Sequence, residues 1–225
     1  MPNTKSATVI LLVSALLLGG CSPANDAIFE WKCDRLPSTA AVVVEFTSVS
    51  YTLDNSLSVS DLTRQFPPTY AGRILGITNA TLAKVISFNN EGVVQAGTGR
   101  VCLRPQIKIN VAFDPMVVHV ASDFPLNSCK YQEVFEHEMR HVQAYTEFLP
   151  TFAAEMESEF KASMGTDLQY FASKDESRQS TDTLIETTWM PYLAARMAEV
   201  QAAQQSIDTR EEYERIARTC PTDGV

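Results

Sequence analysis

Basic residues are scarce in this chain. Lys and Arg together number 18 against 27 Asp and Glu, which gives the 225 residues a formal net charge of −9. Proteins bind phosphate backbones largely through Lys and Arg, so this balance argues against nucleic acid as a partner. Hydrophobic residues make up 45% of the chain and charged residues 20%. This is an ordinary globular balance, and it excludes wholesale disorder.

Long apolar runs are also lacking, apart from residues 7–18, which follow Lys5. A run this short indicates an export signal rather than a membrane-spanning helix, which needs roughly 20 apolar residues. The run ends in Leu18-Gly19-Gly20-Cys21, which resembles a bacterial lipobox. The resemblance implies that residues 1–20 are removed and that Cys21 is lipidated. Because Ser22 follows the cysteine, it further implies an outer-membrane protein facing the periplasm.

No Cys-x-x-Cys pair occurs, which argues against a thiolate zinc site or a redox motif. Beyond Cys21 an even number of cysteines remains, as expected for disulfides in an oxidising compartment. Three connectivities are open, with free buried thiols as the alternative. We prefer Cys102–Cys129 together with Cys33–Cys220, since the second bond would join the two ends of the chain.

The first half of the chain predicts strands. β-branched and alternating residues favour strands, and Pro67-Pro68 ends a short helix. We therefore expect an antiparallel sheet that follows a tether and loop. The tether is expected at residues 21–39, the strands at 41–51, 82–88, 107–113 and 117–120, and the helix at 58–66.

The second half changes to helical periodicity. A first long helix is predicted after Ser128, with a bend or restart at Pro150 and an end at Gly165. A polar loop to about residue 180, a second long helix over 184–205 and a capped short helix from Asp208 to Cys220 complete the chain. The predicted fold is α+β, a single domain over residues 40–220 in which the antiparallel sheet precedes a C-terminal helical hairpin.

The first long helix contains His137-Glu138-Met139-Arg140-His141, an HExxH motif. Residues four apart lie on one helical face, so two imidazoles can converge on one metal ion. The glutamate between them can take a proton from metal-bound water. The chain has only three histidines, and two of them are in this motif. Glu138 also falls within the apolar stripe, where an unpartnered carboxylate would be costly.

On these residues the chain resembles the zincin-type metallopeptidases and, more loosely, the bacterial predicted secreted zinc-dependent proteases. The resemblance covers about residues 41–149. It implies Zn²⁺ held by His137 and His141, with Glu138 as the catalytic general base. Arg140 and Gln143 depart from the wider zincin pattern, which has uncharged residues between the histidines and a hydrophobic residue two places after the second.

A catalytic zinc usually has a third protein ligand, which the sequence leaves open. In an unbroken helix Glu159 would lie about 27 Å from His141, so it is within reach only if Pro150 turns the chain back. If the helix instead continues and the chain returns near residue 170, residues 200–205 would lie beside the histidines. A lone strand histidine is the remaining imidazole. The candidates are Glu159, His119, Asp208, Glu211 and Glu212.

Two functions follow as hypotheses. The first is an envelope-anchored zinc metallopeptidase that hydrolyses the amide bonds of a peptide, a protein or a peptidoglycan cross-link. The alternative is a non-catalytic envelope lipoprotein that acts as a binding or assembly module. A structural zinc site that only braces the helices is a third possibility.

Overall fold

The computed structural model describes residues 23–36, 40–48, 50–66, 72–88 and 92–220, and both helices and strands occur among them. The helices are α1 (Pro23–Cys33), α2 (Val59–Gln65), α3 (Cys129–Met164), α4 (Lys174–Leu184), the π-helical turn η1 (Ile185–Trp189), α5 (Met190–Ile207) and α6 (Arg210–Thr219). The strands are β1 (Ala41–Phe46), β2 (Thr52–Asp54), β3 (Gly76–Phe88), β4 (Gly92–Val94), β5 (Val101–Leu103), β6 (Gln106–Val120) and β7 (Gln169–Phe171). The expected α+β class is therefore present.

Side-chain caps explain where three of the helices begin. The hydroxyls of Ser58, Ser128 and Thr209 each accept a hydrogen bond from a backbone N–H of the following turn. Such caps satisfy donors that have no partner within the helix. The predicted starts of α2, α3 and α6 are confirmed. The polar loop expected before residue 180 is wrong, because this segment contains β7 and α4.

Helix α3 runs for 36 residues and passes through Pro150 without ending. A proline inside a helix leaves the carbonyl four residues earlier without its hydrogen bond. Here that residue is Thr146, and both Thr146 and Pro150 are exposed. Solvent can therefore satisfy the freed carbonyl, which makes the proline tolerable. The restart that we considered at Pro150 is therefore absent.

The larger sheet is built around β6, a strand of 15 residues. Strands β1 and β2 pair with β6 in parallel, and β3 pairs with it antiparallel. The expected antiparallel sheet is thus wrong, as is the expectation of two strands between residues 107 and 120. Alternation of apolar and polar residues predicts that a segment is a strand, but it does not predict which strand pairs with it. Parallel pairing needs a long connection, and the 59 residues between β1 and β6 provide one.

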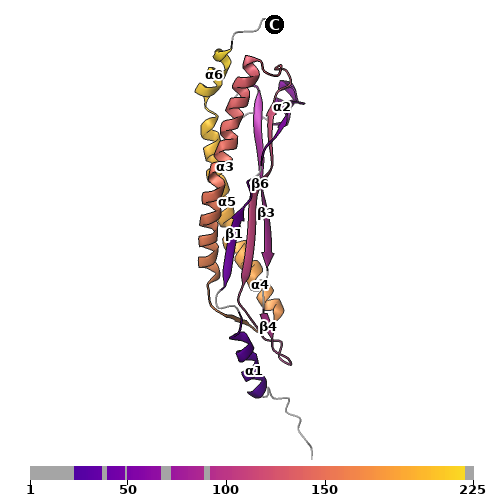
Figure 1. The fold of residues 1–225 in the computed structure, drawn as a ribbon, viewed down its shortest axis with the longest axis vertical. Helices are drawn as coiled ribbons and strands as arrows, with labels where there is room; N and C mark the ends of the chain where they lie inside the picture. The colour runs from indigo at the N-terminus through magenta and orange to yellow at the C-terminus, as the bar shows by residue number, and fades with distance from the viewer. Residues whose placement is uncertain (1–22, 37–39, 49, 67–71, 89–91, 221–225) are drawn as a thin grey trace, which may run out of the picture.

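One face of this sheet is covered by α3, and α5 packs against α3 (Figure 1). Inward-facing side chains of the sheet, among them Val42, Ile109 and Phe113, pack against Phe152 and Met156 of α3. Each such fully buried side chain contributes roughly 1.5–3 kcal/mol to stability. The sheet and the α3–α5 layer therefore form a rigid frame for any site between the helices.

A three-stranded antiparallel sheet, β4-β5-β7, lies with α1 toward one end of the molecule (Figure 1). Cys33 at the end of α1 is bonded to Cys102 of β5. The expected tether is therefore wrong over residues 23–33, which form a disulfide-bonded helix. The lipobox and Cys21 lie outside the described residues. Among the described residues, no helix is long and apolar enough to cross a membrane.

The second disulfide joins Cys129 at the start of α3 to Cys220 after α6. All four cysteines beyond Cys21 are thus bonded, but the pairing that we preferred is wrong. Cys33 and Cys220 are separated because α1 and α6 lie at opposite ends of the molecule (Figure 1). The disulfide instead fastens α6 beside the helix that carries the HExxH motif.

Candidate metal centre

Three side chains with metal-binding atoms meet where α3 passes the turn between α5 and α6. His137 and His141 lie one turn apart on α3, and Asp208 is the residue that ends α5. Both histidines are buried, with 3% and 6% of their surface exposed. Asp208 comes beside them because α5 runs back along α3. The structure therefore brings together two residues of the motif and one of the proposed third ligands.

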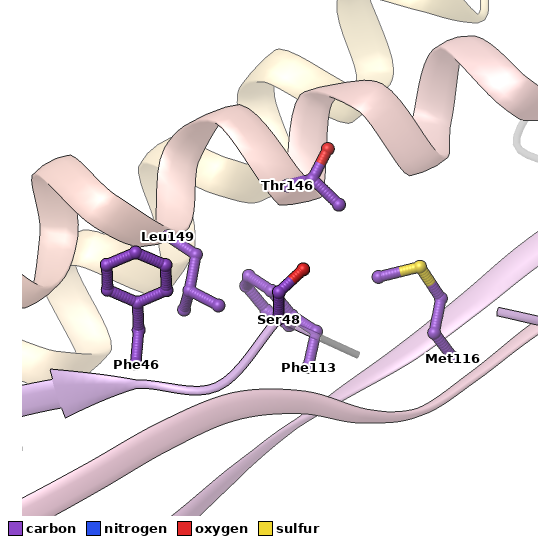
Figure 2. Close-up of a pocket in the computed structure, with 6 residues that line it drawn as sticks. All are labelled: Phe46, Ser48, Phe113, Met116, Thr146 and Leu149. Atoms are coloured by element: carbon purple, nitrogen blue, oxygen red, sulfur yellow. The ribbon is translucent and has the colours of Figure 1, made fainter. Parts of the chain in front are cut away.

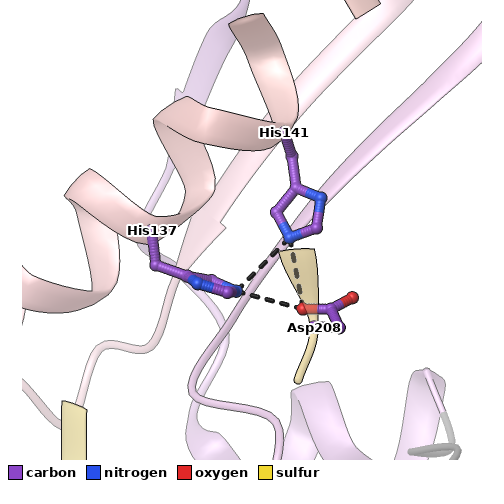
Figure 3. Close-up of side chains that lie close together, drawn as sticks. All are labelled: His137, His141 and Asp208. Atoms are coloured by element: carbon purple, nitrogen blue, oxygen red, sulfur yellow. Dashed lines mark hydrogen bonds and ion pairs between the residues drawn. The ribbon is translucent and has the colours of Figure 1, made fainter. Parts of the chain in front are cut away.

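The three side chains point their free atoms at a common centre (Figure 3). His137 Nε2 lies 3.1 Å from Asp208 Oδ1, and His141 Nε2 lies 3.2 Å from the same oxygen. The two Nε2 atoms are 3.3 Å apart. Three atoms of types that bind metal ions thus form a nearly equilateral triangle.

The size of this triangle fits a tetrahedral ion. Zinc binds histidine nitrogen and carboxylate oxygen at about 2.0–2.2 Å, so neighbouring ligand atoms around a tetrahedral ion stand about 3.3–3.6 Å apart. The edges of the triangle fall at or just below that range. Three protein ligands would leave a fourth position for water, as in catalytic zinc sites.

The tautomer of His141 also suits a metal ligand. Its Nδ1 lies 2.6 Å from Gln204 Oε1, and Gln204 Nε2 donates to the His141 carbonyl at 3.3 Å. Since Gln204 presents its oxygen to the ring, Nδ1 carries the proton and Nε2 carries the lone pair. A lone pair 3.2 Å from a carboxylate oxygen is repelled unless a positive group lies between them.

Glu138 is 3% exposed and lies against β3. Its Oε2 accepts a hydrogen bond of 2.9 Å from the Thr78 hydroxyl. Burial raises the pKa of the carboxyl, against the opposing attraction of His141 and His137 and the hydrogen bond from Thr78. The carboxylate thus faces β3, where the Thr78 hydroxyl holds it.

On the solvent side, α6 adds further polar groups. The Tyr213 hydroxyl donates to Asp208 Oδ1 at 2.9 Å. Arg140 Nη2 lies 2.8 Å from His137 Nδ1 and also contacts Glu212 Oε1. Glu212 Oε1 is itself 3.5 Å from His137 Nδ1. Each ligand of the triangle is thus held by a neighbouring side chain.

The charges of the triangle support one another. Burial would raise the pKa of Asp208, but its hydrogen bonds with His137 and His141 lower that pKa far below its ordinary value. Burial likewise disfavours the charged form of His141, yet Asp208 and Glu138 outweigh it and raise the pKa of the imidazole.

Of the remaining candidates for the third ligand, Glu212 lies beside His137 Nδ1 and not in the triangle, and the other three lie elsewhere. Because α3 is unbroken, Glu159 lies about 27 Å along the helix from His141. Glu211 is exposed on α6. His119 lies on β6 with its Nδ1 3.3 Å from Asp54 Oδ2. Among the described residues, only His137, His141 and Asp208 form a group that could hold a metal.

A small pocket lies further along α3, between Thr146 and Leu149 of the helix and the sheet below (Figure 2). It is lined on the sheet side by Phe46, Phe113 and Met116. The pocket is mainly apolar and does not include the histidines, so we assign it no part in the metal centre.

Sequence reasoning missed three residues of the centre. Gln204 lies in a helix rich in Ala and Gln, and nothing local distinguishes it from its neighbours. Thr78 precedes the strand segment that we predicted. Tyr213 lies in the expected final helix, where a tyrosine has no signal of its own. The return of the chain that we considered does bring residues 200–205, and with them Gln204, beside the histidines, but it assigns no role to Gln204 or Tyr213.

No protein-family model matches the chain, and no curated protein or solved structure matches it significantly.

Proposed function

We propose that the protein is a zinc-dependent hydrolase of amide bonds in peptides, proteins or peptidoglycan cross-links. The observation that carries the proposal is the convergence of His137 Nε2, His141 Nε2 and Asp208 Oδ1, with all three distances between 3.1 and 3.3 Å. The buried Glu138 beside them completes the set that such chemistry needs. His137, His141 and Asp208 would hold the ion.

A bound zinc ion supplies a Lewis acid that polarises the amide carbonyl and acidifies water. The chain supplies the rest. Glu138 accepts the proton of the attacking water and can pass it to the leaving amine. Thr78 fixes the orientation of Glu138 by donating to Oε2. Tyr213 orients Asp208 by donating to Oδ1, and Gln204 orients His141 by accepting from Nδ1–H.

The proposal includes the cellular setting. We propose that the protein is tethered by lipid on Cys21 in the bacterial envelope, at the periplasmic face of the outer membrane, because residues 18–21 resemble a lipobox and Ser22 follows them. The two disulfides suit an oxidising compartment. We further propose that residues 40–220 form a zincin-like domain whose helical hairpin carries the HExxH motif.

The test is to compare Glu138→Gln with the unaltered chain. We expect about one zinc per chain in both by elemental analysis, since Glu138 is not a ligand. Hydrolysis of fluorescent casein and of purified cell-wall sacculi should fall at least about 100-fold in the variant, because a general base typically contributes 10²–10⁴-fold. Glu136→Gln, which alters an exposed acid on the same helix, is the matched control and should keep full activity.

The burial of the motif favours a second candidate, the structural zinc site that only braces the helices. His137 and Glu138 are each only 3% exposed, which leaves a substrate little access. This protein would bind zinc and gain thermal stability, yet Glu138→Gln would change no reaction rate. Full activity in Glu138→Gln would likewise rule out the proposed mechanism.

A further inference from the structure

Arg140 is the residue that departs from the zincin pattern, and its position shows what it does to the centre. Its Nη2 lies 2.8 Å from His137 Nδ1. A guanidinium can only donate hydrogen bonds, so His137 Nδ1 must accept. The ring proton of a neutral His137 is then on Nε2, the atom that faces the triangle.

With this tautomer the centre is satisfied without an ion. The Nε2 proton of His137 points at Asp208 Oδ1, 3.1 Å away, and at His141 Nε2, 3.3 Å away. It therefore occupies the place between the three atoms that a cation would take. Arg140 holds it there from the other side of the ring.

For His137 to bind a metal through Nε2, its proton must move to Nδ1. Nδ1 would then be a hydrogen-bond donor facing the N–H donors of Arg140, and two donors cannot bond to each other. The guanidinium therefore has to move away from His137. Glu212 Oε1 lies 3.5 Å from Nδ1 and is a carboxylate oxygen, so it can accept a hydrogen bond from the Nδ1–H group. The side chain of Arg140 is 44% exposed, so it can swing into solvent.

Glu212 does not depend on Arg140 for its place. Arg215 donates to both of its oxygens, at 2.9 and 3.0 Å, and is itself paired with Glu133 of α3 at 2.6 Å. When Arg140 leaves, Glu212 therefore remains beside His137.

We infer that Arg140 competes with the metal for His137 and that Glu212 is the positioning residue that holds His137 in its metal-binding tautomer. The site thus has two states. In the first, His137 Nε2 carries the proton and Arg140 donates to Nδ1; in the second, Nε2 binds the metal ion and Arg140 has moved away. Arg140 sets how much free zinc the site needs before it fills. This inference rests on the proposed zinc site.

The experiment measures zinc affinity of the purified full chain by competition with a chromophoric chelator. Arg140→Met keeps a long helix-forming side chain but cannot donate, and we expect it to bind zinc about 10-fold more tightly. Glu212→Gln should bind about 10-fold more weakly, in line with the usual effect of changing a group that orients a ligand. Glu211→Gln removes the same charge from the same helix and should match the unaltered chain.

The imidazole nitrogen NMR spectrum supplies a readout that a purely structural or electrostatic role would not move. Three histidines make the spectrum simple to assign. Without zinc, His137 should carry its proton on Nε2 in the unaltered chain and on Nδ1 in Arg140→Met. Adding zinc should move the proton of the unaltered chain to Nδ1, a test that needs no variant.

The outcomes separate this inference from the proposed function. If the unaltered chain binds zinc but neither variant changes the affinity, or if His137 already carries its proton on Nδ1 without zinc, then the competition is wrong and the zinc site stands. If neither the unaltered chain nor Arg140→Met binds zinc, the proposed function fails and the inference fails with it.

Discussion

The carboxylate of Glu138 lies inside the protein, where burial raises its pKa and the neighbouring polar groups offset that effect only in part. Two imidazoles attract it and the Thr78 hydroxyl donates to it, while burial opposes its ionisation. An unpaired buried carboxylate would cost several kcal/mol. The space for the side chain comes from Gly76 on β3, since any larger residue there would collide with Glu138.

Gly76→Ala should therefore disturb both folding and the centre. Its added Cβ would lie 2.6 Å from Val134 Cγ1, 2.8 Å from Glu138 Oε1 and 2.9 Å from the His119 carbonyl oxygen. We expect a loss of about 1–3 kcal/mol in the free energy of unfolding, measured with urea, as for other overpacked sites. The control is Gly92→Ala, whose nearest contacts would be 3.1 and 3.2 Å. An equal loss in both variants would contradict this account.

Among the elements, local signals in the sequence predict more than long-range ones. Ser128 and Thr209 mark the starts of α3 and α6 because a cap acts within one turn. The parallel pairing of β1 with β6 and the disulfide partner of Cys33 depend on contacts between distant segments. For the same reason the HExxH motif predicts His137 and His141, while Asp208 stayed one candidate among several.

At the scale of elements, the carboxylate of Glu157 links α3 to strand β1, and its contribution to stability depends on pH. Glu157 Oε2 accepts a 2.9 Å hydrogen bond from the Val44 N–H of β1, and Oε1 accepts one of 2.5 Å from Lys161. The bonds from Lys161 and from the Val44 backbone lower the pKa of Glu157 from its ordinary 4.5. Because the pKa of Glu157 is lower in the folded protein than in the unfolded chain, its ionised carboxylate stabilises the fold fully above pH 4.5. This contribution is lost as the pH falls through the folded pKa.

Glu157→Gln should thus lower the free energy of unfolding by about 1 kcal/mol at pH 7. The difference from the unaltered chain should shrink as urea titrations are repeated from pH 5 down to pH 3. Glu159→Gln, an exposed acid on the same helix, controls for the loss of charge. A difference that stayed constant with pH would mean that Glu157 does not act through its charge.

At the scale of the whole molecule, the two disulfides hold different ends and should have separable effects. The bond between Cys129 and Cys220 fastens α6, which carries Glu212 and Tyr213 and follows Asp208. Ile216 of α6 also packs into the cluster around Val134. The bond between Cys33 and Cys102 fastens α1, at the end away from the metal centre.

Replacing both members of either disulfide by Ser should lower the free energy of unfolding by about 2–4 kcal/mol. Only the loss of Cys129–Cys220 should also weaken zinc binding, because it frees the helix that follows Asp208. Zinc titration of the two folded double variants at equal temperature checks this. The proposed ligand role of Asp208 would lose its support if both variants bound zinc as tightly as the unaltered chain.

The length of α3 has a consequence for where the protein could act. From His141 to Met164 the helix extends about 35 Å, and α1 lies beyond that end (Figure 1). Under the proposed lipid anchor on Cys21, two residues ahead of α1 in the sequence, the metal centre would lie in the part of the molecule away from the bilayer. The length of α3 would then set the height above the membrane at which the centre works.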